Sequence, residues 1–242
     1  MGKGLAGIGV ILGLAIASSG VAANAATLYA EDFSGQNGKG ATGGTATDTS
    51  GVGWSIELND ASLFDSNDYF RVQNEAFTAR DTNSGCATTT CPSSSGNPDP
   101  IFPIWLSEVI DISNYTNLSF SLDAFASATQ FEHDANDPIG QKDYYLVSYL
   151  LDGVEILAAD LITATGPFTN QTVNQSVADG STLQVKVTMN STAANELLSF
   201  DNVLVEGDLK APTDPQGTPE PATAIALLGL GSLAAISRRR HG

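Results

Sequence analysis

The chain has 242 residues, with 27 Asp and Glu against ten Lys and Arg, so its formal net charge is −17. An acidic chain of this kind repels phosphate backbones, which argues against nucleic acid as a partner. The length allows one or two domains once the two ends of the chain have been set aside.

Residues 1–25 have the pattern of a secretion signal. Lys3 gives a short positive start, and residues 5–17 form an uncharged run of Leu, Ile, Val, Ala and Gly. Ala23 and Ala25 show the small-x-small pattern that signal peptidase accepts, so we predict cleavage after Ala25 by that partner. The alternatives are a buried apolar helix or a membrane anchor, but the apolar run is short and ends in small residues.

Between residues 26 and 208 helical periodicity is nearly absent, and apolar residues alternate with polar ones as they do in strands. The alternation is clearest over residues 118–124 and 183–189, which predicts half-buried antiparallel strands. Further strands are expected at residues 27–33, 54–58, 69–73, 105–112, 144–151, 154–157 and 197–206. The predicted fold class is all-β, a single antiparallel β-sandwich of the jelly-roll kind over residues 26–208.

Turns and loops are predicted between these strands. Asp152-Gly153 lies between two apolar runs and predicts a hairpin. Long surface loops are expected at residues 35–53 and 82–103, and the second contains Cys86 and Cys91. In an exported protein these two cysteines predict a local disulfide, which would stabilise the fold by about 2 kcal/mol.

The C-terminal end combines a linker, an apolar run and a basic tail. Residues 209–218 are polar and Pro-rich, which predicts a semi-extended linker. Residues 222–237 are nearly all apolar or small, and predict a short transmembrane helix. The basic tail that follows, Arg238, Arg239 and Arg240, should stay on the cytoplasmic side. The part outside then has six Lys and Arg against all 27 acids, a net charge of −21.

The order of these C-terminal features resembles a known sorting signal. Pro219-Glu220-Pro221, an apolar helix and the arginine tail, within residues 219–242, look like a PEP-CTERM signal of Gram-negative bacteria that make extracellular polysaccharide. The resemblance implies that an exosortase cuts near the tripeptide and releases or re-attaches the external domain. It also implies a place at the cell envelope, cell surface or extracellular matrix, with transient anchoring in the membrane through the helix.

The central region has a second resemblance. Residues 105–113, 143–147, 151–153 and 199–203 resemble segments of secreted bacterial jelly-roll domains, which are similar in build to carbohydrate-binding modules. This resemblance implies a β-sandwich and an association with extracellular polysaccharide as a partner.

Calcium is the cofactor that the acidic residues suggest. Glu31 and Asp32 end the first predicted strand, and Asp201-Asn202 lies in the last one. In jelly-roll domains these two strands often lie side by side, and carboxylates with backbone oxygens could supply the six to eight ligands of a calcium ion. The alternative is that these are solvated carboxylates at strand ends.

A second acidic segment contains Glu132, Asp134, Asn136 and Asp137, with Asp143 beyond it. The spacing of the first three residues is similar to the opening of an EF-hand loop. Asp137 stands where that loop needs Gly, and no helices are predicted beside it. The segment is therefore either a calcium-binding loop of another kind or a solvated hairpin loop.

Catalytic signatures are weak, and we assign no catalytic residue. His133 is the one histidine between residues 26 and 221, and no Gly-x-Ser-x-Gly elbow occurs. The predicted function is therefore a non-catalytic, exported module associated with extracellular polysaccharide. Two alternatives remain, a structural matrix protein without a specific ligand and a hydrolase of extracellular polymers. Aromatic side chains could stack on sugars, although most should lie in the core: Trp54, Tyr69, Phe70, Trp105, Tyr115, Tyr144, Tyr145 and Tyr149.

Overall fold

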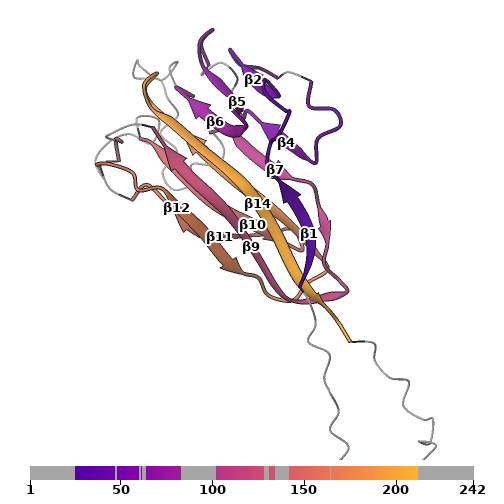
Figure 1. Ribbon diagram of the computed structural model, residues 1–242. Coiled ribbons are helices and arrows are strands. Elements are labelled where there is room, and N and C mark those ends of the chain that lie inside the picture. Colours follow the sequence, from indigo (N-terminus) through magenta and orange to yellow (C-terminus); the bar gives the residue numbers. More distant parts are fainter. Residues whose placement is uncertain are drawn as a thin grey trace, which may run out of the picture. The chain divides into compact units, whose positions relative to one another are not determined.

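The computed structural model describes residues 25–211 except 47, 60, 62–63, 83–101, 128–130, 134–141 and 164. Within these residues the chain forms fourteen β-strands in two antiparallel sheets (Figure 1). This confirms the predicted all-β antiparallel sandwich. The described part contains no helix that is long and apolar enough to span a bilayer. The predicted signal segment before Ala25, the C-terminal helix 222–237 and the Cys86–Cys91 disulfide lie outside the described residues.

The larger sheet has eight strands in the order β12-β9-β14-β6-β5-β2-β3, with β1 paired to β14. Their bounds are β1 Ala26–Glu31, β2 Gly40–Thr42, β3 Thr45–Ala46, β5 Tyr69–Gln73, β6 Ala76–Arg80, β9 Tyr115–Ala126, β12 Gln171–Ser176 and β14 Leu197–Leu209.

The smaller sheet has six strands in the order β11-β10-β13-β7-β4, with β8 paired to β13. Their bounds are β4 Trp54–Glu57, β7 Ile104–Ser107, β8 Ile110–Asp111, β10 Tyr144–Leu151, β11 Val154–Asp160 and β13 Thr182–Asn190.

Alternation of apolar and polar residues explains why these segments are strands of a two-layer fold. In β9, Leu118, Phe120 and Leu122 are buried, whereas Ser119 and Ser121 between them are half-buried on the outer face. The predicted hairpin is also confirmed, because β10 pairs with β11 across Asp152-Gly153. Both turn residues have positive φ, 50° and 80°, which is the conformation that an Asp-Gly hairpin turn requires.

The core between the sheets is centred on an aromatic cluster. The ring of Phe77 lies 4.8–6.5 Å from the rings of five other aromatic residues, which are Phe33, Trp54, Phe70, Trp105 and Phe200. Of the aromatic residues considered for sugar stacking, Trp54, Phe70, Trp105, Tyr145 and Tyr149 are buried in this core. Tyr69, Tyr115 and Tyr144 are half-buried.

Several strands were not predicted from the sequence. Residues 35–53, expected to be a long surface loop, contain β2 and β3, and Ala41 of β2 is fully buried against the fold. Gly40 explains this packing, because a Cβ atom there would lie only 2.5 Å from the backbone oxygen of Phe70. The predicted strand 105–112 is split into β7 and β8, and β6 and β12 were not expected.

The long strand β14 changes its partner on one side, and this shapes the outer face of the larger sheet. Leu197–Phe200 pair with β6, whereas residues 203–207 pair with β1. Between these two stretches lie Asp201 and Asn202, where the pairing with β9 on the other side also shifts in register. Asn202 has a positive φ of 52°, as a bulged residue often does. The result is a break in the sheet at the end of β1.

Candidate functional site: a polar groove on the larger sheet

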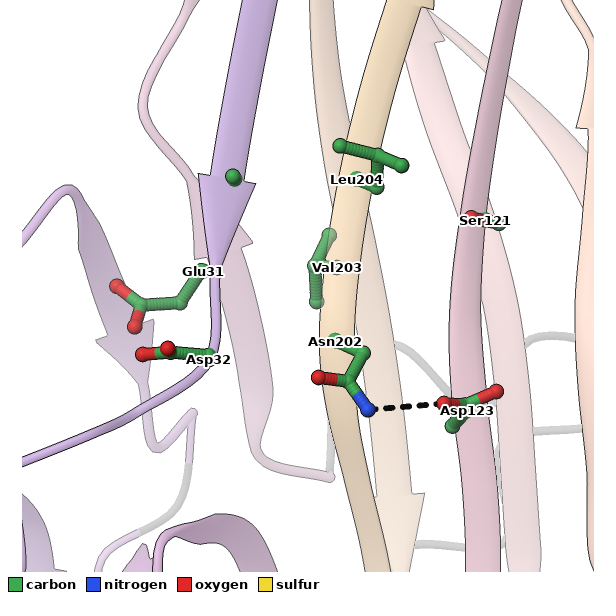
Figure 2. Close-up of a pocket in the computed structure, with 8 residues that line it drawn as sticks. Glu31, Asp32, Ser121, Asp123, Asn202, Val203 and Leu204 are labelled. Carbon is green, nitrogen blue, oxygen red and sulfur yellow. Dashed lines mark hydrogen bonds between the residues drawn. The ribbon is translucent and has the colours of Figure 1, made fainter. Parts of the chain in front are cut away.

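A hollow of about 430 Å³ lies at this break, between β1, β14 and β9 (Figure 2). It is lined by Ala30, Glu31, Asp32, Ser121, Asp123, Asn202, Val203 and Leu204. Figure 2 shows the amide of Asn202 reaching across from β14 to Asp123 on β9, and the Nδ2–Oδ2 distance is 2.9 Å. The other oxygen of Asp123 accepts a hydrogen bond of 2.6 Å from the hydroxyl of Thr172 on β12. These bonds fix the Asp123 carboxylate on the outer face.

Two further hollows adjoin the first one along β9. One of about 270 Å³ shares Ser121 and Leu204 with it, and extends over β12 to Asn174 and Ser176. The other, of about 360 Å³, shares Asp123 and extends to Phe125 and Asn170. We call the three hollows together the groove. The side chains along it are mainly hydroxyls, amides and carboxylates on a rigid four-stranded platform.

Phe125 is the one half-buried aromatic residue that lines the groove. It lies on the outer face of β9 because it continues the outward series of Ser119, Ser121 and Asp123. Sequence analysis missed Phe125 as a binding residue, although the period-2 pattern of its own strand places it on the polar face. A ring at this position offers an apolar surface for stacking beside polar partners.

The structure brings the first pair of predicted calcium ligands next to the second. Glu31 at the end of β1 is opposite Val203 of β14, so the strands that carry Glu31-Asp32 and Asp201-Asn202 lie side by side. In Figure 2 the carboxylates of Glu31 and Asp32 lie on the side of the β1 chain away from β14. Glu31 is buried, and its Oε1 accepts hydrogen bonds from Phe33 N at 2.7 Å and Gln36 Nε2 at 2.8 Å.

The electrostatics of this neighbourhood show that the carboxylates repel one another. Burial and, to a smaller extent, the negative charges of Asp32, Asp123 and Glu31 raise the pKa of Asp201. A hydrogen bond from the backbone N–H of Asn202 acts in the opposite direction. The four carboxylates are near enough to interact, but Glu31 has its hydrogen bonds inside the fold.

Three other carboxylates come closer together at one end of the sandwich. Oxygens of Glu132, Asp143 and Glu196 lie within 4.8 Å of one another, and Asp143 and Glu196 are buried. We call this set the three-carboxylate group. Of the four residues of the predicted loop, Glu132 is described and belongs to this group. Asp134, Asn136 and Asp137 lie outside the described residues. Asp143 lies just beyond that segment in the sequence, whereas Glu196 was missed because it lies 64 positions after Glu132 and no local motif connects the two.

Burial and repulsion between the carboxylates raise the pKa values of Asp143 and Glu196. Asp143 accepts hydrogen bonds from the backbone N–H groups of Glu132 at 2.6 Å and Thr192 at 2.8 Å. Burial nevertheless raises the pKa of Asp143 to about 7. Burial and the neighbouring carboxylates of Asp143 and Glu132 raise the pKa of Glu196 to about 8. Asp143 and Glu196 therefore disfavour their own ionisation. A divalent cation that prefers oxygen ligands, as calcium does, would relieve this cost at the three-carboxylate group.

Residues 218–240 match the model of the PEP-CTERM protein-sorting motif. The motif indicates an exported protein that an exosortase processes, typically in a Gram-negative envelope. Pro219, Glu220, Pro221 and the three arginines of the tail all fall within the match but lie outside the described residues. The comparison with curated proteins finds no match.

Solved structures of similar build include carbohydrate-binding jelly-roll modules. The K3 cleaved adhesin domain of Lys-gingipain from Porphyromonas gingivalis is 12% identical, with a TM-score of 0.39, over 76% of this chain and 99% of that one. A CBM4 module is 12% identical, with a TM-score of 0.35, over 64% and 95%. The CBM22-1 xylan-binding domain of Xyn10C from Paenibacillus barcinonensis is 11% identical, with a TM-score of 0.30, over 79% and 100%.

Proposed function

We propose that this chain is a non-catalytic, exported β-sandwich module that binds extracellular polysaccharide along the groove. The observation that supports this function best is the groove itself, three adjoining hollows on the open face of a rigid sheet. Its hydroxyl, amide and carboxylate groups match the hydroxyl groups of a sugar chain as donors and acceptors. A binding site of this extended, shallow form accommodates a linear polymer better than a small metabolite.

The sorting motif is consistent with this function. An exosortase substrate is exported to the envelope, where a polysaccharide ligand would be within reach. The acidic surface alone does not require a ligand, so a purely structural matrix protein is the first alternative. That alternative predicts no specific retention on any polysaccharide.

A hydrolase of extracellular polymers is the second alternative. The three-carboxylate group holds its oxygens within 4.8 Å of one another and buries Asp143 completely. Glycoside hydrolases space their two carboxyl groups by about 5–5.5 Å or about 6.5–9.5 Å across the bond that is cut. Because Asp143 and Glu196 are buried, a sugar chain cannot reach between these carboxylates, and we propose that they hold calcium as a structural ion instead.

Replacing Phe125 by alanine should weaken polysaccharide binding about five- to fifteenfold, because one sugar loses its stacking surface, a contact worth about 1–1.5 kcal/mol. The measurement is co-sedimentation of the purified protein with the extracellular polysaccharide of the producing organism. Leu157→Ala is the matched control, since Leu157 is an exposed apolar residue on the smaller sheet. Unchanged binding of Phe125→Ala would show that Phe125 does not contact the polysaccharide. The absence of binding by the native protein would contradict the proposed function.

A further inference from the structure

The four strands that carry the groove contain no basic residue. β1, β9, β12 and β14 together have Glu31, Asp123, Asp201, Glu206 and Asp208, and Asp32 follows β1 directly. None of the residues lining the three hollows is Lys or Arg. The basic residue closest in sequence, Lys210, comes after the end of β14.

The acids of the groove are also not neutralised by ion pairs. The ion pairs identified in the described part of the chain, Lys39–Asp48 and Lys186–Glu155, lie outside the groove. Asp123 accepts its hydrogen bonds from the neutral groups of Thr172 and Asn202. Asp32 is exposed, and its Oδ1 accepts a hydrogen bond of 3.0 Å from the backbone N–H of Ser34. Asp123 therefore gives the hollow a negative potential that a ligand or solvent ions can offset.

We propose that the groove selects a polysaccharide whose sugars carry free, protonated amino groups over neutral and acidic polysaccharides. This inference rests on the proposed function and names the class of polymer. An ammonium group offers three donors, which the carboxylate of Asp123 and the hydroxyl of Ser121, both on β9 and both lining the first hollow, can accept. A uronic acid polymer meets like charge at the same positions, which costs free energy in a half-enclosed site.

The test uses three defined probes with the purified protein at about pH 6, where amines are protonated. They are β-1,4-linked N-acetylglucosamine oligosaccharides, the same oligosaccharides after deacetylation, and an oligouronate of equal length. We expect calorimetry to show at least tenfold tighter binding of the deacetylated form than of the acetylated form. This preference should shrink as salt is raised from about 0.05 to 0.5 M, because salt screens charges. The oligouronate should not bind, with or without added calcium.

The outcomes separate the inference from the function on which it rests. Equal binding of acetylated and deacetylated probes, or binding of the oligouronate, would overturn the charge selection and leave polysaccharide binding intact. If none of the probes binds but the native extracellular polysaccharide is retained, the charge selection is again wrong. If neither the probes nor the native polysaccharide binds, both proposals fail.

Two single variants test which carboxylate produces the preference for the deacetylated probe. Asp123→Asn should lower the preference for the deacetylated probe about two- to fivefold, the range for one partly exposed charge pair. Asp32→Asn should lower it less, because the carboxylate of Asp32 lies on the side of β1 away from β14 (Figure 2). Binding of the acetylated probe should change little in Asp32→Asn, whose amide oxygen can still accept from Ser34. Glu57→Gln is the matched control, because Glu57 is an exposed acid on β4 of the smaller sheet. An undiminished preference in Asp123→Asn would show that the charge selection does not depend on the groove, and would overturn the assignment.

Discussion

Replacing Phe77 by alanine should lower the free energy of unfolding by about 3–5 kcal/mol, the range for truncating a fully buried aromatic residue. Phe77 has no exposed surface, and its ring contacts five other aromatic rings contributed by both sheets. Its loss would leave a cavity that these large, mutually packed rings cannot easily fill. Because a domain is stable by only about 5–15 kcal/mol, the variant should unfold at a much lower urea concentration.

Urea unfolding followed by tryptophan fluorescence measures this loss, since Trp54 and Trp105 both lie in the cluster. Phe77→Leu should lose clearly less stability than Phe77→Ala because it leaves a smaller cavity. Val109→Ala is the control for a surface position, as Val109 is 62% exposed, and its effect should stay within about 0.5 kcal/mol. A loss for Phe77→Ala as small as that control would mean that the cluster does not hold the two sheets together.

Calcium should raise the melting temperature by about 5–10 °C when its concentration is about 100 times its dissociation constant, because binding to the folded state alone then adds about 2.7 kcal/mol. The ion would bind at the three-carboxylate group, where its attraction to Glu132, Asp143 and Glu196 would offset the repulsion between these carboxylates. The measurement is a thermal scan with calcium and with EDTA. Magnesium should not substitute, because it demands a smaller octahedral set of ligands.

The pH dependence without calcium follows from the same carboxylates. The folded-state pKa values of Asp143 and Glu196 are raised to about 7 and about 8, above the values of about 4 in the unfolded chain. The folded state therefore binds more protons than the unfolded state between about pH 4 and pH 8. It follows that stability in EDTA falls as the pH rises through this window. With calcium bound the carboxylates are already ionised, and the fall should be much smaller.

Glu196→Gln should have opposite effects in the two conditions. In EDTA at pH 8 it should raise the melting temperature by about 2–4 °C, since one buried negative charge is removed, a gain of about 1 kcal/mol. In calcium it should lose most of the increment that the native protein shows. Asp179→Asn serves as the control, because Asp179 is exposed and outside the group. If calcium shifts the melting temperature of Glu196→Gln as much as that of the native protein, the ion binds elsewhere, and Asp201→Asn would test the β1–β14 neighbourhood.

The local pattern of the sequence predicts those strands whose turns and alternation are both distinct. β10 was predicted with its observed bounds, Tyr144–Leu151, because a run of apolar residues ends at Asp152-Gly153. β6 was missed, since its short apolar stretch follows a turn at Asn74-Glu75 that has no glycine. Both turn residues there have positive φ, which a sequence without Gly does not reveal.

The candidate site was harder to predict, because it depends on which strands become neighbours. Polar residues of β9 are visible in the sequence, but Thr172 and Asn202 meet Asp123 only once β12 and β14 flank that strand. The neighbourhood of Glu31 and Asp201 could be predicted from the resemblance to jelly-roll domains. The inward orientation of Glu31 could not, since it depends on hydrogen bonds from Phe33 and Gln36 after the strand has ended.

The central claim is that the groove binds polysaccharide, and blocking it is the most direct test. Ser121 lines two of the three hollows, so Ser121→Tyr should fill the groove without entering the core. Ser55→Tyr places the same side chain at an exposed position of β4 on the smaller sheet. The measurement is the affinity of the native protein and both variants for the extracellular polysaccharide of the producing organism, with melting temperatures recorded in parallel. We expect at least tenfold weaker binding for Ser121→Tyr and native affinity for Ser55→Tyr. Equal affinity of all three proteins, with the fold intact, would contradict the account.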